Sequence, residues 1–99
     1  MYAGENGVVK DEAEAVKWYR KAAEQGVANA QTFLGLMYAD GRGVVRDELE
    51  ACKWWLLASA QGEENAKKII SIIESQLTPQ QRAEGQRLAR EWKPVQPSQ

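Results

Sequence analysis

A repeat of about 36 residues is the feature that most constrains how this chain can fold. When the sequence is shifted against itself by this amount, Met1-Tyr2-Ala3 falls on Met37-Tyr38-Ala39. The register then holds without a gap until Asn29-Ala30 falls on Asn65-Ala66. A period of this length is typical of units that cover their apolar faces only by stacking on one another. The chain is therefore expected to form a repeat solenoid.

The second helix of each unit carries its own start and stop signals. Asp11 and Asp47 each precede a glutamate by three residues, the spacing of a capping box, so helices are expected to start there. Gly26 and Gly62 stand where a left-handed residue would end these helices. Apolar residues recur between these limits at helical intervals, as Ala15, Trp18, Tyr19 and Ala22 in the first copy and Ala51, Trp54, Trp55 and Ala58 in the second.

The other helix of the unit is expected over residues 29–39, and the glycine-rich segment 41–46 is expected to turn the chain back. In the first copy Gly4-Glu5-Asn6 takes the place of Asp40-Gly41-Arg42, so that turn should be built somewhat differently. Each repeat is thus a helix hairpin. The residues expected on the buried side of this helix are Ala30, Phe33, Leu34, Met37 and Tyr38.

The repeat pattern weakens in a helix expected over residues 64–75, and one further helix follows it. Thr78-Pro79-Gln80-Gln81 has the N-cap, first-position proline and reciprocal glutamine of a helix start. Because this last helix has only a narrow apolar edge, it should close the stack, with Ala83, Leu88, Ala89 and Trp92 facing inward. The expected fold is all-α, an α/α superhelix of antiparallel helix hairpins with a C-terminal capping helix.

The pattern resembles that of the Sel1-like repeat family, which is related to the tetratricopeptide repeats. The matching residues are Ala30, Leu34-Gly35, Tyr38, Gly41, Gly43-Val44, Asp47, Ala51, Trp54-Trp55, Ala58 and Gly62. The resemblance implies an α/α solenoid that acts as an adaptor, as its relatives do in bacterial complexes, signalling and host interaction. The repeat and helix signals together divide the chain into a repeat domain over residues 1–93, with a partial repeat 1–26, a full repeat 27–62 and a terminal half repeat with its cap 63–93, followed by a tail 94–99. The cysteine-paired branch of the family is excluded because Cys52 is the single cysteine.

The residue inventory argues against catalysis. Without histidine and with one cysteine, the chain cannot build a Ser-His-Asp or Cys-His nucleophile or a His/Cys metal site. A carboxylate pair remains conceivable, but the glutamates belong to helix caps and solvated faces. Cys52 is expected to be a buried thiol, and the aromatic residues are expected in the core. The chain should therefore be no enzyme and need no cofactor or metal.

Charge and hydropathy point to a protein partner. Thirteen Lys and Arg against 14 Asp and Glu leave no basic surface for nucleic acid or an anionic membrane. The sequence has no apolar run of membrane-spanning length and no signal-peptide pattern at Met1, so a soluble protein is expected, in an undetermined compartment.

The leading hypothesis is that the inner surface of the solenoid holds a peptide or helix of another protein. Candidate contacts fall off the core stripe of the first helix type, and they are Gln31, Thr32, Leu36 and Lys67. The chain also begins near the end of a first helix, so the stripe of Ala15, Trp18, Tyr19 and Ala22 should be partly uncovered. It could then be part of a longer solenoid, or a structural module that self-associates through this N-terminal helix as a homo-oligomer.

Overall fold

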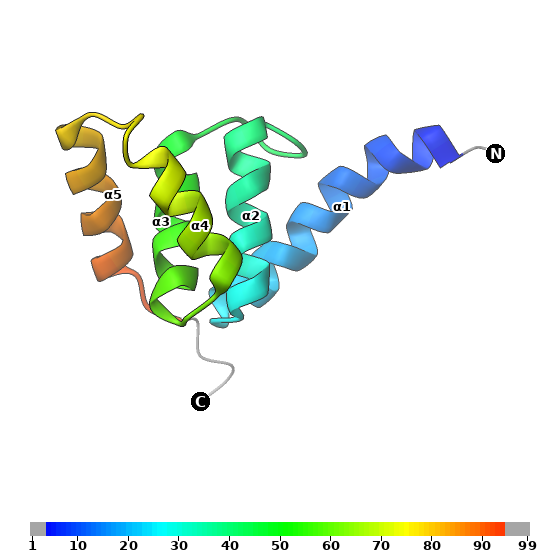
Figure 1. Cartoon of the computed structure of the whole chain (residues 1–99). Coiled ribbons are helices and arrows are strands. Elements are labelled where there is room, and N and C mark those ends of the chain that lie inside the picture. The colour runs from blue at the N-terminus through cyan, green and yellow to red at the C-terminus, as the bar shows by residue number, and fades with distance from the viewer. Residues whose placement is uncertain (1–3, 95–99) are drawn as a thin grey trace.

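The computed structural model describes residues 4–94, and side chains from residue 12 onward. These residues form five α-helices and no strand, which confirms the expected all-α fold of helix hairpins (Figure 1). The helices are α1 (Gly4–Glu24), α2 (Ala28–Asp40), α3 (Glu48–Ala60), α4 (Glu64–Ile73) and α5 (Pro79–Glu91).

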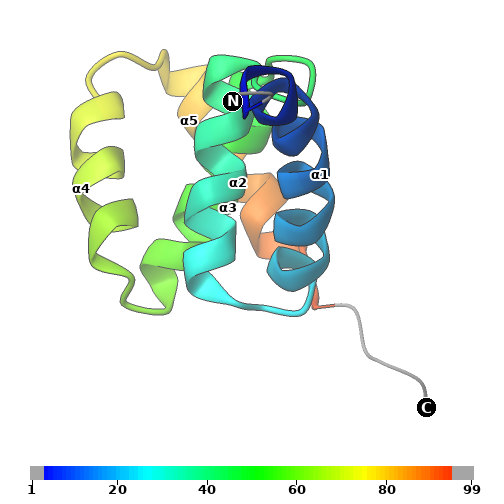
Figure 2. The same ribbon diagram turned by 90° about the vertical axis from the view of Figure 1, so that its right-hand side faces the viewer.

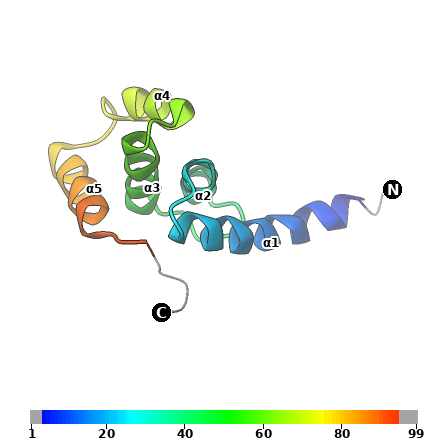
Figure 3. The same cartoon turned by 90° about the horizontal axis from the view of Figure 1, so that it is seen from below.

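α3 lies at the centre of the helix stack. α3 packs against α2 on one side and α4 on the other, while α1 covers α2 and α5 covers α3. α2 and α4 run in the same direction and α3 runs against them (Figures 1 and 2). Seen from below, α4 lies on one side of the α2–α3 pair and α1 on the other, and α5 flanks α3 (Figure 3). α2 and α4, the first helices of successive repeats, are adjacent along one side of the stack.

α1 is one uninterrupted helix, and both the turn expected at Gly4-Glu5-Asn6 and the helix start expected at Asp11 are wrong. The repeat register places Glu5 opposite Gly41, which ends α2 with φ 69°. Because residues with a Cβ avoid this left-handed conformation, the first copy lacks the stop signal of the second and the helix continues. The first turns of α1 project away from the other helices (Figure 1).

The loop after α2 is docked on α1. A Cβ atom at Gly43 would come within 2.6 Å of the Glu12 carbonyl oxygen, and the same glycine has φ 75°. The Arg42 guanidinium lies 3.4 Å from the Glu12 carboxylate. The loop thus needs glycine both for its backbone conformation and for its close approach to α1.

The helices expected over residues 29–39 and 64–75 are present as α2 and α4, and two of the three expected N-caps, Asp47 and Thr78, start a helix. The Asp47 carboxylate accepts hydrogen bonds from the backbone N–H groups of Leu49 and Glu50 at the start of α3. The reciprocal hydrogen bond of a capping box, from the Asp47 N–H to the Glu50 carboxylate, is absent, because the Asp47 N–H donates to the Tyr38 carbonyl. The Glu50 carboxylate instead pairs with Lys53 at 3.0 Å. At α5 the full capping box between the side chains and backbone of Thr78 and Gln81 is formed.

One cluster of buried side chains joins α1, α2 and α3. Trp54 is its largest member, only 2% exposed, and the ring of Trp92 covers it edge-on with centroids 5.6 Å apart. The other members are Val16, Ala23, Ala30, Leu34 and Met37. Burying this much apolar area on three helices is the main force that holds the repeats together.

α5 packs on α3 through a close contact between Gly85 and Cys52, which the apolar residues of α5 alone did not predict. Gly85 is buried, and a Cβ atom there would meet the Cys52 sulfur at 2.7 Å. Cys52 is buried as expected, and burial, together with the charge of Glu74, raises the pKa of its thiol. Ala83, expected to face inward, is exposed because the packed face of α5 is centred on Gly85.

Candidate functional site

A groove runs between α2 and α4 on the side of the stack that the first helices share. It has a volume of about 270 Å³. Both helices contribute side chains along their length, and the residue before α4 closes one end. The lining residues are Asn29, Thr32, Phe33, Leu36, Glu63, Asn65, Lys68, Ile69 and Ile72.

The two walls of the groove are equivalent positions of successive repeats. In the repeat register the four wall positions of α2 correspond to the four of α4. The pairs are Asn29 with Asn65, Thr32 with Lys68, Phe33 with Ile69, and Leu36 with Ile72. These positions lie one turn apart on one face of a helix, so stacking two repeats is enough to build the groove.

The middle of the groove is apolar and open to solvent. Phe33 is 47% exposed, Leu36 37% and Ile72 61%. Phe33 was expected in the core, but its ring stacks on Tyr19 of α1 with centroids 5.3 Å apart and leaves its other side to the groove. Neighbouring exposed apolar side chains with a polar border are typical of protein-interaction surfaces.

A hydrogen bond between repeats forms the polar floor. The Thr32 hydroxyl donates to the Glu63 carboxylate at 2.6 Å, and the same oxygen accepts from the Ala66 N–H at 2.9 Å. These bonds, the one from Thr32 first, lower the pKa of Glu63 and keep it ionised as the N-cap of α4. Glu63 is therefore an ionised group of the groove floor, held in place by neutral hydrogen-bond donors.

The structure separates the four expected contact residues. Leu36 lines the groove and is accessible. Thr32 lines it only as a buried floor residue. Lys67 lies outside the lining and pairs with Glu64 at 3.7 Å, whereas its neighbour Lys68 is in the wall.

Gln31 is fully buried, so its expected place on an open surface is wrong. Its side-chain N–H donates to the Ala23 carbonyl at 3.1 Å, and its side-chain oxygen accepts from Gln61 at 3.1 Å. α2 is covered by α1 on one side and α3 on the other, so its buried arc is wider than a single apolar stripe. Asn29 and Phe33 were missed for the same reason. Lys68 lies on α4, and the repeat register, which pairs it with Thr32, could have indicated it.

The other candidate surface lies on α1. Trp18 is 64% exposed, whereas its counterpart Trp54 is in the core. This agrees with the expectation that the stripe is partly uncovered and contradicts the expectation that every aromatic residue lies in the core. The Lys21 ammonium lies 5.2 Å from the centroid of the Trp18 ring. The remaining members of the stripe are partly buried against the core, and they are Ala15, Tyr19 and Ala22.

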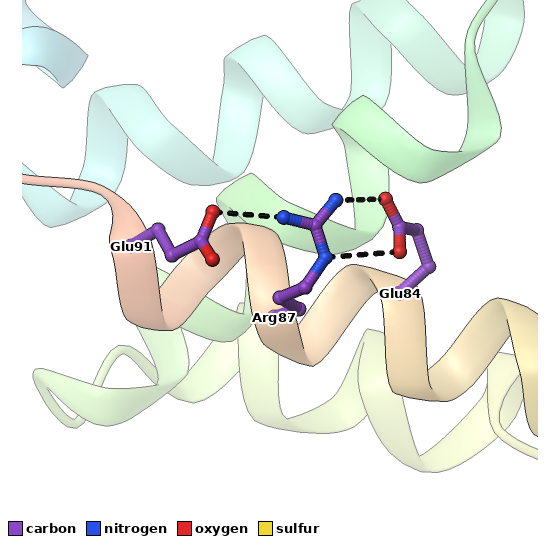
Figure 4. Close-up of polar contacts among 3 residues, drawn as sticks. All are labelled: Glu84, Arg87 and Glu91. Atoms are coloured by element: carbon purple, nitrogen blue, oxygen red, sulfur yellow. Dashed lines mark hydrogen bonds and ion pairs between the residues drawn. The ribbon is translucent and has the colours of Figure 1, made fainter.

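Charged side chains on the outer face of α5 pair with one another. Arg87 donates hydrogen bonds to Glu84 on one side and to Glu91, at 2.8 Å, on the other (Figure 4). The bonds to Glu84 and Glu91 raise the pKa of Arg87, and the bond from Arg87 lowers that of Glu84. These residues act as a solvated ion-pair network that supports the helix.

Within the described residues no cluster of His, Cys, Asp and Glu could hold a metal ion. A search of those same residues found no helix with the length and apolarity needed to cross a membrane.

Comparison with known proteins gives consistent matches. The model of the Sel1 repeat matches residues 1–27 and 28–63. The chain is also similar to the crystal structure of a protective antigen present in uropathogenic Escherichia coli strains, described as displaying an SLR fold, with a TM-score of 0.77 and 38% identity. The similarity covers 84% of this chain but only 18% of the antigen. No curated protein matches the chain.

Proposed function

Because the chain belongs to the Sel1 repeat family, whose members are generally protein-interaction modules and typically non-enzymatic scaffolds, we propose that it binds a segment of another protein in the α2/α4 groove. The observation that carries this proposal is the exposed apolar strip of Phe33, Leu36 and Ile72 at repeat-equivalent positions. A peptide or helix laid along α2 and α4 would cover this strip.

The shape of the groove favours side chains of a protein over a small molecule. Its volume of about 270 Å³ lies at the lower edge of the roughly 300–1,000 Å³ of small-molecule sites. It is an open trough with amide and charged groups at its border, as expected of a surface that anchors a few apolar side chains. Leu36 is a direct contact in this proposal, whereas Thr32 acts through Glu63 and Lys67 stands outside the trough.

Selection of binders from a displayed peptide library, followed by measurement of their affinities, tests the proposal. Leu36→Asp and Ile72→Asp each place a carboxylate on the apolar strip, and we expect each to weaken binding by tenfold or more, about 1.4 kcal/mol or more. Val45→Asp is the matched control, because Val45 is an exposed apolar residue, 87% accessible, in the loop outside the groove. Binders that tolerate both groove substitutions would refute the groove as the site.

A second candidate is self-association through α1, as a structural module with no separate ligand. Trp18 favours it, because a tryptophan offers about 150–250 Å² for burial and this one is largely exposed. A stable interface usually buries about 1,200–2,000 Å², so Trp18 would need its neighbours on the Ala15, Tyr19 and Ala22 stripe and more of α1. A second copy of the chain would supply the same patch about a twofold axis.

Sedimentation velocity at micromolar concentration tests this second candidate. A dimer that Trp18→Glu dissociates and Leu36→Asp leaves intact would support it. A wild-type chain that remains a folded monomer would rule it out.

A further inference from the structure

We propose that the α2/α4 groove selects an amphipathic helix of the partner that carries an acidic side chain beside its apolar face, where Lys68 can pair with it. The inference rests on the proposed function and adds the chemistry of the partner. Lys68 is the single cation in the groove wall.

The charges around the groove leave Lys68 without a partner inside the protein. No carboxylate of residues 12–94 lies within 4.0 Å of its ammonium group. Its neighbour Lys67 is paired with Glu64, and Lys53 with Glu50. Lys68 therefore has its charge available to a ligand.

The acidic group of the groove, Glu63, forms no ion pair with Lys68. Glu63 accepts hydrogen bonds from Thr32 and from the N–H of Ala66 and serves the N-terminus of α4. The opposite wall adds no charge, because α2 has no charged residue before Asp40. A ligand covering the apolar strip would meet the Lys68 ammonium as the one positive charge of the groove wall, with no ion-pair partner within 4.0 Å, so a carboxylate placed beside it is the complementary group.

The spacing of the apolar positions favours a helix as the occupant. Phe33 and Leu36 on α2, like Ile69 and Ile72 on α4, are separated by one turn, a rise of about 5 Å. Side chains on one face of a partner helix repeat at the same interval, so they can interdigitate with both walls. On an extended strand, side chains of one face are about 6.7 Å apart and lose register with the walls.

A pair of synthetic helical peptides tests the proposal on the full chain. Both peptides have about 15 residues with leucines on one helical face, and they differ only in glutamates or lysines flanking that face. We expect the wild-type chain to bind the glutamate peptide about two- to fivefold more tightly, and the preference to shrink at high salt. Lys68→Glu should reverse the preference, and Lys67→Glu, the matched control, should retain it.

The outcomes separate this inference from the proposed function. Equal affinity for the two peptides, both lost in Leu36→Asp, would overturn the acidic preference and leave the groove as the binding site. Binding of neither peptide, with library-selected binders still sensitive to Leu36→Asp, would overturn the helix as occupant. If Lys67→Glu reversed the preference as strongly as Lys68→Glu, the role of Lys68 would be overturned, because the preference would then follow the net charge of the protein and not the groove wall.

Discussion

At the scale of single residues, Gly35 shows how a close approach of helices determines one side chain. A Cβ atom at Gly35 would lie 2.6 Å from the indole nitrogen of Trp55 and 2.8 Å from the adjacent ring carbon. The indole cannot easily yield, because its N–H donates to the Thr32 carbonyl at 3.1 Å. The glycine is therefore required by packing in the middle of a helix, where its flexibility is otherwise a disadvantage.

Gly35→Ala should consequently destabilise the protein even though alanine is the better helix former. Alanine gains about 1 kcal/mol of helix propensity, but a clash with Trp55 this close costs about 2–3 kcal/mol, the upper part of the range for overpacking, so we expect a net loss of about 1–2 kcal/mol. Urea unfolding followed by circular dichroism measures this loss. Ser71→Ala is the repeat-equivalent control on an exposed part of α4 and should be neutral or slightly stabilising. An equally stable Gly35→Ala variant would contradict the packing argument.

At the scale of the helix, the same N-cap signal, an aspartate three residues before a glutamate, starts a helix in the second repeat but not in the first. Asp47 caps α3, whereas Asp11 lies inside α1. The difference depends on the residues before the cap. Gly41 ends α2, and the loop that contains Gly41 and Gly43 separates that helix from Asp47. Contacts with Glu12 hold this loop in place.

Asp47→Ala should remove the cap and lower the free energy of unfolding by about 1 kcal/mol, within a range of about 0.5–2 kcal/mol. Asp47→Asn should retain most of the stability, because its amide oxygen can accept the same backbone hydrogen bonds. Thermal and urea unfolding of the two variants makes the comparison. If both variants lose the same amount, the carboxylate charge and not the hydrogen bonds would be responsible.

Helices, hairpins and the capping helix could be predicted from the sequence because their signals are local. The capping box at Thr78, the left-handed Gly26, Gly41 and Gly62, and the hairpin period are all properties of short segments. The candidate groove could be predicted only in part. Leu36 was correctly predicted to lie on the open surface. Whether Gln31 or Phe33 is exposed depends on how α2 is rotated about its axis between α1 and α3. The apolar pattern of α2 alone does not define that rotation.

At the scale of the whole molecule, polar side chains tie one repeat to the next. Thr32 binds Glu63, and Gln31 binds Gln61, whose side-chain N–H also donates to the Gly26 carbonyl at 2.9 Å. These bonds join the turns that follow α1 and α3 to α2. They fix the separation of α2 and α4 and hence the groove.

The bond to Glu63 should make stability depend on acid pH. Its pKa is lowered in the folded protein, so ionised Glu63 stabilises the fold above its ordinary pKa of 4.5, and this contribution is lost as the pH falls through the lowered value. Between about pH 5 and pH 3 the wild-type chain should therefore lose more stability than Glu63→Gln. Urea unfolding across this interval measures the difference. Thr32→Val removes the main cause of the lowered pKa of Glu63, so the stability of this variant should depend less on pH than that of the wild-type chain. If the stability of all three proteins changed with pH in parallel, Glu63 would not be the responsible group.

The repeat-equivalent walls of the groove have a consequence for longer arrays. Because every added unit would present its own copy of the four wall positions, the contact surface would grow by copy number and not by new chemistry. A partner with several matching segments would then bind by avidity, since engagement of one segment raises the effective concentration of the next. Weak contacts in each unit could in this way give strong and reversible attachment overall.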